Sequence, residues 1–232
     1  MACVSSSNNM KPYHIHHSLV CLILSLCSCL GAQAVELKPQ GASVDDIVPS
    51  GWLHEEVSGD LNKDGITDLV VVATPDYAEN MQTRDDGYVF NFNQPILAIY
   101  FGTAQGQFQL WKQYDNVIPA DEDEFCRHEA SLEITSRGAL HITMQLWCSM
   151  GSYGTTTNSY TYRYQNGDFY LIGTDSEEMS RNTGETTVVS ENYLTWKRQV
   201  VKSNAFDETM PSTEKWTKLR KRPLEKLGAR EL

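Results

Sequence analysis

A short run of oxygen-bearing side chains is the part of the sequence best suited to chemistry. These groups stand at alternate positions of one segment and are Asp60, Asn62, Asp64, the main-chain carbonyl of Ile66, and Asp68. Alternate spacing lets one tight turn aim the oxygens at a single point, and Ca²⁺ takes about six to eight hard oxygen ligands at about 2.3–2.6 Å. We therefore predict a calcium site at residues 60–68, with water completing the coordination shell.

The residues after this loop indicate whether it is followed by a helix, as in an EF-hand, or by a strand. Gly65 stands where the chain must reverse sharply and where a Cβ would be in the way. An EF-hand needs a bidentate Glu at the twelfth position, but Val71 occupies that position here. Residues 68–74 are mostly β-branched and apolar and show no helical period. The loop is therefore expected to lead into a strand of a β-protein.

The same loop carries a resemblance to a known family. Residues 59–71, GDLNKDGITDLVV, followed by residues 99–108, IYFGTAQGQF, resemble one FG-GAP or VCBS repeat, the unit that builds the propellers of integrin α-chains. The resemblance covers residues 57–110. It implies a calcium loop between two antiparallel strands, with Asp60, Asn62, Asp64 and Asp68 as side-chain ligands. Because only one copy of the loop is present, a partial propeller is expected instead of a complete one.

A second resemblance concerns the later part of the chain. Residues 163–175, RYQNGDFYLIGTD, resemble the C-terminal part of a group of uncharacterised secreted bacterial proteins that carry one FG-GAP-like loop. This resemblance implies a shared fold and no known activity.

The N-terminal region predicts export. Residues 18–30 form an apolar run that is too short to span a membrane and matches a signal-peptide core, and residues 32–34, Ala-Gln-Ala, suit a cleavage site. We expect a signal peptide at residues 1–34, with Met10 as an alternative start, and a periplasmic or extracellular protein beginning at Val35. The sequence before Cys29 also matches a lipobox, so a membrane-anchored lipoprotein is the less favoured alternative.

The predicted mature chain is strongly acidic. The sequence has 19 Lys and Arg against 30 Asp and Glu, and residues 1–34 contain one Lys and no acid, so residues 35–232 have a formal charge of −12. Such a surface repels nucleic acid and favours cations. We expect no nucleic-acid partner, and we expect the basic segment 218–227 to be solvated or to pair with the acidic surface. The length suits a single β-rich domain at residues 35–232.

Cys126 and Cys148 are the two cysteines that remain after the leader is removed. Two cysteines in an oxidising compartment indicate one disulfide. The alternative is a second metal site formed by Glu124, Cys126, His128 and Glu129. The disulfide is favoured because a secreted cysteine with an available partner is more often bonded than ligating.

The rest of the sequence is patterned for hairpins. Apolar and polar residues alternate on both sides of Arg137-Gly138, and Asn-Gly at 166–167 separates two further strand runs. We predict a mainly β fold of antiparallel sheets built from hairpins, partial-propeller-like or sandwich-like, with few helices. Trp52 and Leu53 are expected to anchor the core. The long polar insertion at 75–95 is expected to be a disordered surface loop.

The expected function is that of a secreted, calcium-stabilised β-domain that acts as a binding or structural module without catalysis. Its partner would be a protein or a glycan. One alternative is a carbohydrate-binding accessory protein, which requires that Tyr160, Tyr162 and Tyr164, with Trp111 or Trp147, form an exposed flat patch. The other is a hydrolase with paired carboxylates, which are recognised by their separation in space and not by sequence.

Overall fold

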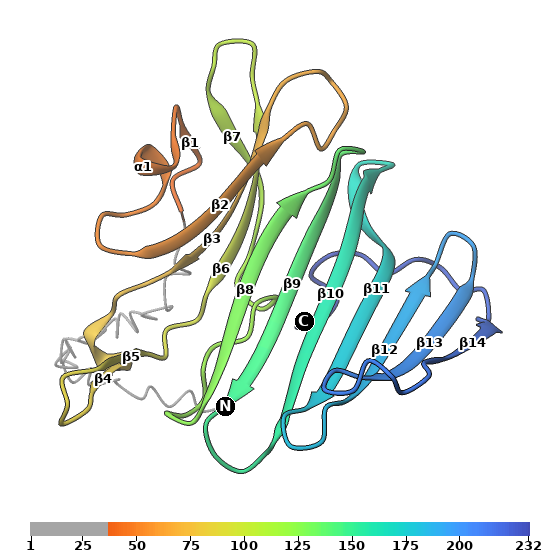
Figure 1. Ribbon diagram of the computed structural model, residues 1–232. Coiled ribbons are helices and arrows are strands. Elements are labelled where there is room, and N and C mark those ends of the chain that lie inside the picture. The colour runs from red at the N-terminus through yellow and green to blue at the C-terminus, as the bar shows by residue number, and fades with distance from the viewer. Residues whose placement is uncertain (1–36) are drawn as a thin grey trace, which may run out of the picture. The chain divides into compact units, whose positions relative to one another are not determined.

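Two antiparallel sheets and one small hairpin make up the fold in the computed structural model, which describes residues 37–232 (Figure 1). The predicted mainly β class with few helices is confirmed. The helical elements of the described residues are the single turn α1 (Val44–Ile47) and the 3₁₀ turn η1 (Ala78–Asn80). None of the helices in this range is long and apolar enough to cross a membrane. The predicted signal peptide and the lipobox at Cys29 lie outside the described residues.

The first sheet has five strands, and its centre is formed by apolar segments. In spatial order the strands are β1 (Gln40–Gly41), β7 (Phe108–Tyr114), β6 (Ile96–Gly102), β3 (Asp68–Thr74) and β2 (Leu53–Gly59). Continuous β-branched and apolar runs are typical of strands covered on both faces. Accordingly, β3 is buried from Asp68 to Ala73 and β6 from Ile96 to Tyr100.

The second sheet is a seven-stranded meander in which every strand pairs with its neighbours in sequence. It curls like part of a barrel (Figure 1). Its strands are β8 (Cys126–Ile134), β9 (Ala139–Cys148), β10 (Gly154–Gln165), β11 (Asp168–Ser180), β12 (Glu185–Asn192), β13 (Lys197–Asn204) and β14 (Thr213–Lys218). Asn166 and Gly167 have φ of 52° and 78°, as the tight turn of a two-residue hairpin requires, so this predicted hairpin is confirmed.

The two sheets meet where the edge strand β2 lies beside the edge strand β8 (Figure 1). The Leu132 N–H donates to a carboxylate oxygen of Glu55 at 2.8 Å. Gly59 is also needed there, because a Cβ at this position would lie 2.8 Å from the Ile134 side chain. Apolar side chains of both sheets fill one core, and its buried members include Val70, Val72, Leu97, Ile99, Leu140, Ile142, Tyr162, Phe169 and Leu171.

Residues 219–232 also pack into this core. Leu227 is 2% exposed, and its N–H donates to the Phe169 carbonyl at 3.0 Å. The Leu232 N–H donates to the Val117 carbonyl at 2.9 Å. The expectation of a solvated segment is wrong for Leu227, because burial of this leucine outweighs the polar character of its neighbours.

The other part of that expectation, pairing with acidic groups, is confirmed at Lys226. Its ammonium lies 2.8 Å from an Asp168 carboxylate oxygen. Burial of Asp168 opposes its ionisation, but hydrogen bonds from Lys226 and the Phe169 N–H, together with the charges of Lys226 and Lys112, outweigh it and lower the pKa of Asp168. The ion pair therefore fastens the segment to the start of β11.

The insertion at 75–95 is ordered, so the expectation of a disordered loop is wrong. It contains the hairpin of β4 (Met81–Thr83) and β5 (Val89–Asn91). Asn93 is buried, and its amide donates to the Tyr77 carbonyl at 3.1 Å and to the Asn91 side chain at 2.8 Å. Amide side chains thus satisfy the backbone of a segment that has few apolar residues to bury.

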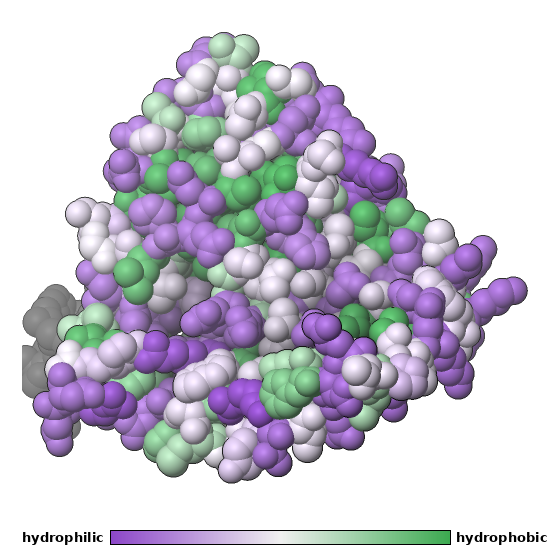
Figure 2. Space-filling view, in the orientation of Figure 1, coloured by the Kyte–Doolittle hydropathy of each residue, from purple (hydrophilic) through white to green (hydrophobic). Residues whose placement is uncertain are grey.

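The predicted core anchors before the loop differ from each other in the structure. Leu53 is 67% exposed, so its expected role in the core is wrong. Trp52 is half-buried, and its ring meets that of Tyr77 edge-on at 5.9 Å between centroids. Leu53 stands at the start of β2, which is an edge strand whose side chains are mostly exposed. Exposed apolar residues are common on this protein: the face in Figure 2 shows hydrophobic residues scattered among hydrophilic ones.

Candidate metal centre

The predicted calcium loop connects β2 to β3, and the pairing of Gly59 with Asp68 closes its base. Asp60 begins the loop, and both of its carboxylate oxygens accept backbone hydrogen bonds. Oδ1 accepts from the Lys63 N–H at 2.6 Å, and Oδ2 accepts from the Gly65 N–H at 3.0 Å. These bonds hold the chain in a tight reversal in which Lys63 and Gly65 both take positive φ. The expectation that a Cβ at Gly65 would be in the way is wrong, because no heavy atom of the described residues beyond its chain neighbours lies within 4 Å of that position, and it is the positive φ that favours glycine there.

The middle of the loop repeats this pattern at shorter range. Asn62 Oδ1 accepts from the Asp64 N–H at 2.9 Å, and Asp64 Oδ1 accepts from the Ile66 N–H at 2.7 Å. The Asn62 amide also donates to Asp64 Oδ2 at 3.0 Å. Asp64 is exposed and Asn62 is half-buried. The side chains are therefore fixed by the loop itself, and each acceptor oxygen keeps a lone pair for a further partner.

Asp68 lies at the base of the loop and is fully buried. Its Oδ2 accepts from the Leu61 N–H at 2.8 Å and from the Asn62 N–H at 3.3 Å, while Oδ1 accepts from the Gly102 N–H at 2.9 Å. This carboxylate ties the loop both to itself and to the end of β6. Sequence reasoning missed Gly102 as a partner, because the contact spans 34 positions and depends on the register of β3 against β6.

The electrostatics of Asp68 are unfavourable to its charge. Burial raises its pKa, the backbone hydrogen bonds from Gly102, Leu61 and Asn62 oppose that rise, and the nearby Asp64 adds to it. Within residues 37–232 no Lys, Arg or His forms an ion pair with Asp68. A buried carboxylate without a counter-charge is stabilised when a cation binds close to it.

The donor set fits calcium by chemistry, because it consists of carboxylate, amide and carbonyl oxygens on one loop. Hydrogen bonds link Asn62, Asp64 and Ile66 to one another, and the Asn62 N–H donates to Asp68. Asp60 is tied to the same loop through the N–H groups of Lys63 and Gly65 and, within the described residues, its carboxylate has no hydrogen bond to the other predicted ligands. The carboxylates are not drawn into a dense cluster. Over the described range there is no group of three or more His, Cys, Asp and Glu side chains that could hold a metal ion.

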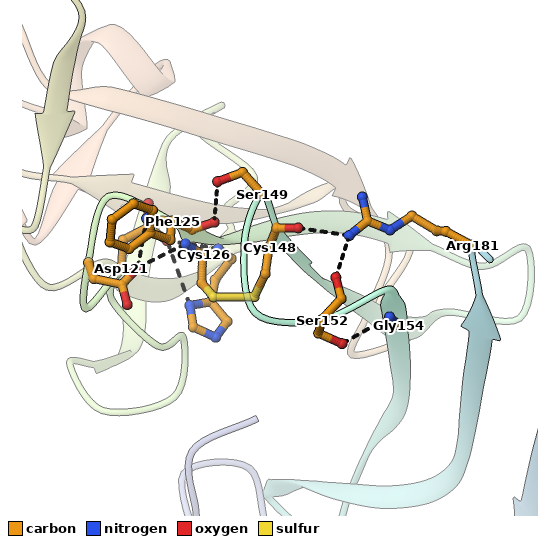
Figure 3. Close-up of a disulfide and its surroundings, with 10 residues drawn as sticks. Asp121, Phe125, Cys126, Cys148, Ser149, Ser152, Gly154 and Arg181 are labelled. Carbon is orange, nitrogen blue, oxygen red and sulfur yellow. Dashed lines mark hydrogen bonds and ion pairs between the residues drawn. A yellow bond between two sulfur atoms is a disulfide. The ribbon is translucent and has the colours of Figure 1, made fainter.

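The predicted disulfide joins Cys126 and Cys148, which face each other across β8 and β9 (Figure 3). Neighbouring groups fasten this end of the sheet. The Ser149 N–H donates to the Phe125 carbonyl at 2.8 Å, and the Arg181 guanidinium donates to the carbonyls of Cys148 and Ser152 at 2.9 and 2.8 Å.

The alternative second metal site is not formed. The sulfur of Cys126 is bonded to Cys148, so it is not available as a thiolate ligand. His128 and Glu129 are consecutive residues of β8 and therefore point to opposite faces. His128 instead lies beside Asp121, whose Oδ1 accepts the His128 backbone N–H at 2.7 Å.

The tyrosines of β10 face the core. Tyr162 is buried, and the Tyr164 ring lies 5.1 Å from that of Phe101 and 5.9 Å from that of Trp111. Tyr160 packs against the same core. These residues therefore do not form the exposed flat patch that a carbohydrate surface requires. Trp147 does reach the surface, with 42% of its side chain area exposed.

Comparison of the chain with protein-family models, with curated proteins and with solved structures gave no match. The function is therefore argued from the loop and its surroundings.

Proposed function

We propose that this protein is an exported β-domain that binds Ca²⁺ at residues 60–68 and acts as a binding or structural module, not as an enzyme. One observation carries the calcium proposal: the fully buried Asp68, at the base of a loop built from oxygen donors, forms no ion pair with a cationic side chain of residues 37–232. Calcium would supply the missing positive charge. It would also hold the loop that links β2 to β3.

In this proposal, hydrogen bonds already orient the side-chain oxygens that would bind calcium. Asp60, Asn62 and Asp64 would offer side-chain oxygens that hydrogen bonds within the loop already orient. Ile66 would offer its carbonyl. Asp68 accepts a hydrogen bond from the Gly102 N–H at the end of β6. Calcium binding would therefore fix the position of the loop relative to β6 and stabilise the centre of the first sheet.

The family and the location are part of the same proposal. The loop lies between two paired antiparallel strands, which is the setting that the FG-GAP or VCBS resemblance implies. A protein of this kind would be exported after removal of residues 1–34. Anchoring through a lipidated Cys29 is the alternative. The disulfide between Cys126 and Cys148 supports an oxidising compartment.

Calcium binding is tested by thermal unfolding of chelator-treated protein during titration with CaCl₂. Binding to the folded state alone stabilises it by about 2.7 kcal/mol at a hundred times the dissociation constant. For a domain of this size that corresponds to a rise in Tm of roughly 5–10 °C. The double variant Asp60→Asn, Asp64→Asn removes two charges at nearly constant side-chain size and should lose most of the rise. Each amide replaces one accepting oxygen with a donor, so the rise is measured against the calcium-free form of the same variant.

The matched control is Glu208→Gln, because Glu208 is exposed and lies far from the loop in sequence. It should retain the full response. An unchanged Tm at millimolar calcium would refute the calcium proposal, and so would an equal rise in the double variant.

A second candidate function, carbohydrate binding, is favoured by one surface. Trp147 is joined there by Tyr153, which is 71% exposed, and the Arg181 guanidinium lies 5.5 Å from the Trp147 ring centroid. Exposed aromatic rings can stack on sugar rings. A glycan array should then give hits that Trp147→Ala and Tyr153→Ala abolish. Hits that survive both substitutions would exclude this surface.

A further inference from the structure

A groove of about 950 Å³ lies beside the candidate calcium loop. Its walls come from the loop, the turn between β8 and β9, the strands β10 and β11, and the turn after β12. The loop and the first of these turns are in direct contact: a Cβ at Gly138 would lie 2.5 Å from the Asp60 carbonyl oxygen. The loop therefore forms part of the groove wall.

Three cationic side chains line the groove, although the chain as a whole is acidic. They are Lys63, Arg137 and Arg163. In the part of the chain that the structure describes, none of them forms an ion pair with a carboxylate. Arg163 instead donates to the Gln165 amide oxygen at 3.2 and 2.7 Å, which orients the guanidinium and leaves its charge uncompensated.

Asp60 is the one acidic residue among the described groove-lining residues. Its two oxygens accept the backbone N–H groups of Lys63 and Gly65, so they are directed into the loop. The local charge of the groove is therefore positive. Because the Debye length is about 8 Å at physiological ionic strength, the three cations act on a bound group more strongly than the distant acidic surface does.

The remainder of the wall combines hydroxyl-bearing and aliphatic residues. Ile134, Ile172 and Leu194 line it, and Leu194 is 46% exposed. None of the described lining residues is aromatic. A neutral glycan or a single-stranded nucleic acid binds largely by stacking on aromatic rings, which this groove does not offer. Cations beside aliphatic side chains instead complement a segment that carries both carboxylates and aliphatic groups.

We propose that this groove binds an acidic peptide segment of a protein partner, with carboxylates on Lys63, Arg137 and Arg163 and an aliphatic side chain against Ile134, Ile172 and Leu194. This inference deepens the proposed role as a binding module and rests on it. The volume is of the size that holds a short segment or a small ligand.

The test is fluorescence anisotropy with the labelled peptide Gly-Leu-Glu-Glu-Leu-Glu-Gly, its Gln-for-Glu counterpart, and the untagged full chain in calcium. The Glu peptide should bind, and its affinity should fall as NaCl is raised. The Gln peptide should bind at least about tenfold more weakly, as should the Glu peptide to the double variant Lys63→Gln, Arg137→Gln. Both substituted residues are exposed, so the fold should be retained.

The matched control is Arg220→Gln, Lys221→Gln, which removes two exposed cations from a different surface depression near the C-terminal end. It should leave the affinity unchanged. Failure of the Glu peptide to bind overturns the proposal, as does equal binding of the Gln peptide. Loss of binding only in the control variant places the contact elsewhere. If a heparin fragment binds more strongly than the peptide, the groove is assigned to a sulfated glycan and the peptide proposal is overturned.

The calcium-dependent Tm is measured on the same samples. The single variant Arg137→Gln, which leaves the sequence of the calcium loop unchanged, should keep its calcium response while its affinity for the Glu peptide falls. A missing calcium response with intact peptide binding would refute the metal proposal and leave the groove assignment standing, so the two failures are distinguishable.

Discussion

Replacement of Leu227 by Ala should destabilise the protein by about 3 kcal/mol. The side chain is 2% exposed and belongs to the core shared by both sheets. Removing a buried leucine costs about 2–5 kcal/mol, because transfer energy is lost and a cavity remains. We place the cost near the middle of this range, since the segment that carries Leu227 is held by its own hydrogen bonds and cannot collapse freely into the gap.

Urea unfolding followed by tryptophan fluorescence measures this cost. The midpoint should fall while the denaturant slope stays unchanged, and Tm should drop by roughly 6–12 °C. Leu53→Ala is the matched control and should change stability by less than about 0.5 kcal/mol, because Leu53 is 67% exposed. If Leu227→Ala costs no more than this control, the packing of residues 219–232 into the core is refuted.

Three further predictions concern other parts of the fold. Lys226 lowers the pKa of Asp168, so the ionised carboxylate stabilises the folded protein at pH values above the ordinary Asp pKa of about 4. This stability is lost as the pH falls through the lower pKa of the folded state. In a plot of unfolding free energy against pH, Asp168→Asn should therefore reduce the loss of stability at acid pH. Gly138→Ala should cost about 1–3 kcal/mol in urea, because φ is +72° and the added Cβ meets a loop carbonyl; wild-type stability would contradict that contact. Replacing Cys126 and Cys148 by Ser should cost about 3 kcal/mol, and a Tm insensitive to reductant would count against the disulfide.

Features that depend on neighbouring residues could be predicted from the sequence. The Asn166-Gly167 turn follows from the positive φ that these residues tolerate. The strand after the calcium loop follows from the β-branched run at 68–74. The disulfide followed from counting, since Cys126 and Cys148 were the only pair outside the leader.

Features that depend on distant residues could not be predicted. Leu53 and Leu227 are the same residue type, yet one is exposed on an edge strand and the other is buried between sheets, because tertiary position decides burial. The insertion at 75–95 has a polar composition, but its Asn93 network orders it through contacts across 16 positions.

The candidate site also has one part that depends on neighbouring residues and one that depends on distant residues. The donor residues of the loop share one segment, and their spacing suggested calcium. The groove is assembled from separate segments, and Arg137 and Arg163 come together with Lys63 only after the sheets have met.

The pairing pattern of the second sheet has a consequence for the order of folding. Each of its strands pairs with its sequence neighbours, so the meander can grow one hairpin at a time with short loop closures. Leu232 meets Val117 across 115 positions, and such a contact forms only after a costly long-range closure. The meander can thus be assembled before residues 219–232 dock. Weakening that docking should mainly raise the unfolding rate and leave the folding rate nearly unchanged. The contacts of residues 219–232 therefore slow the unfolding of the domain.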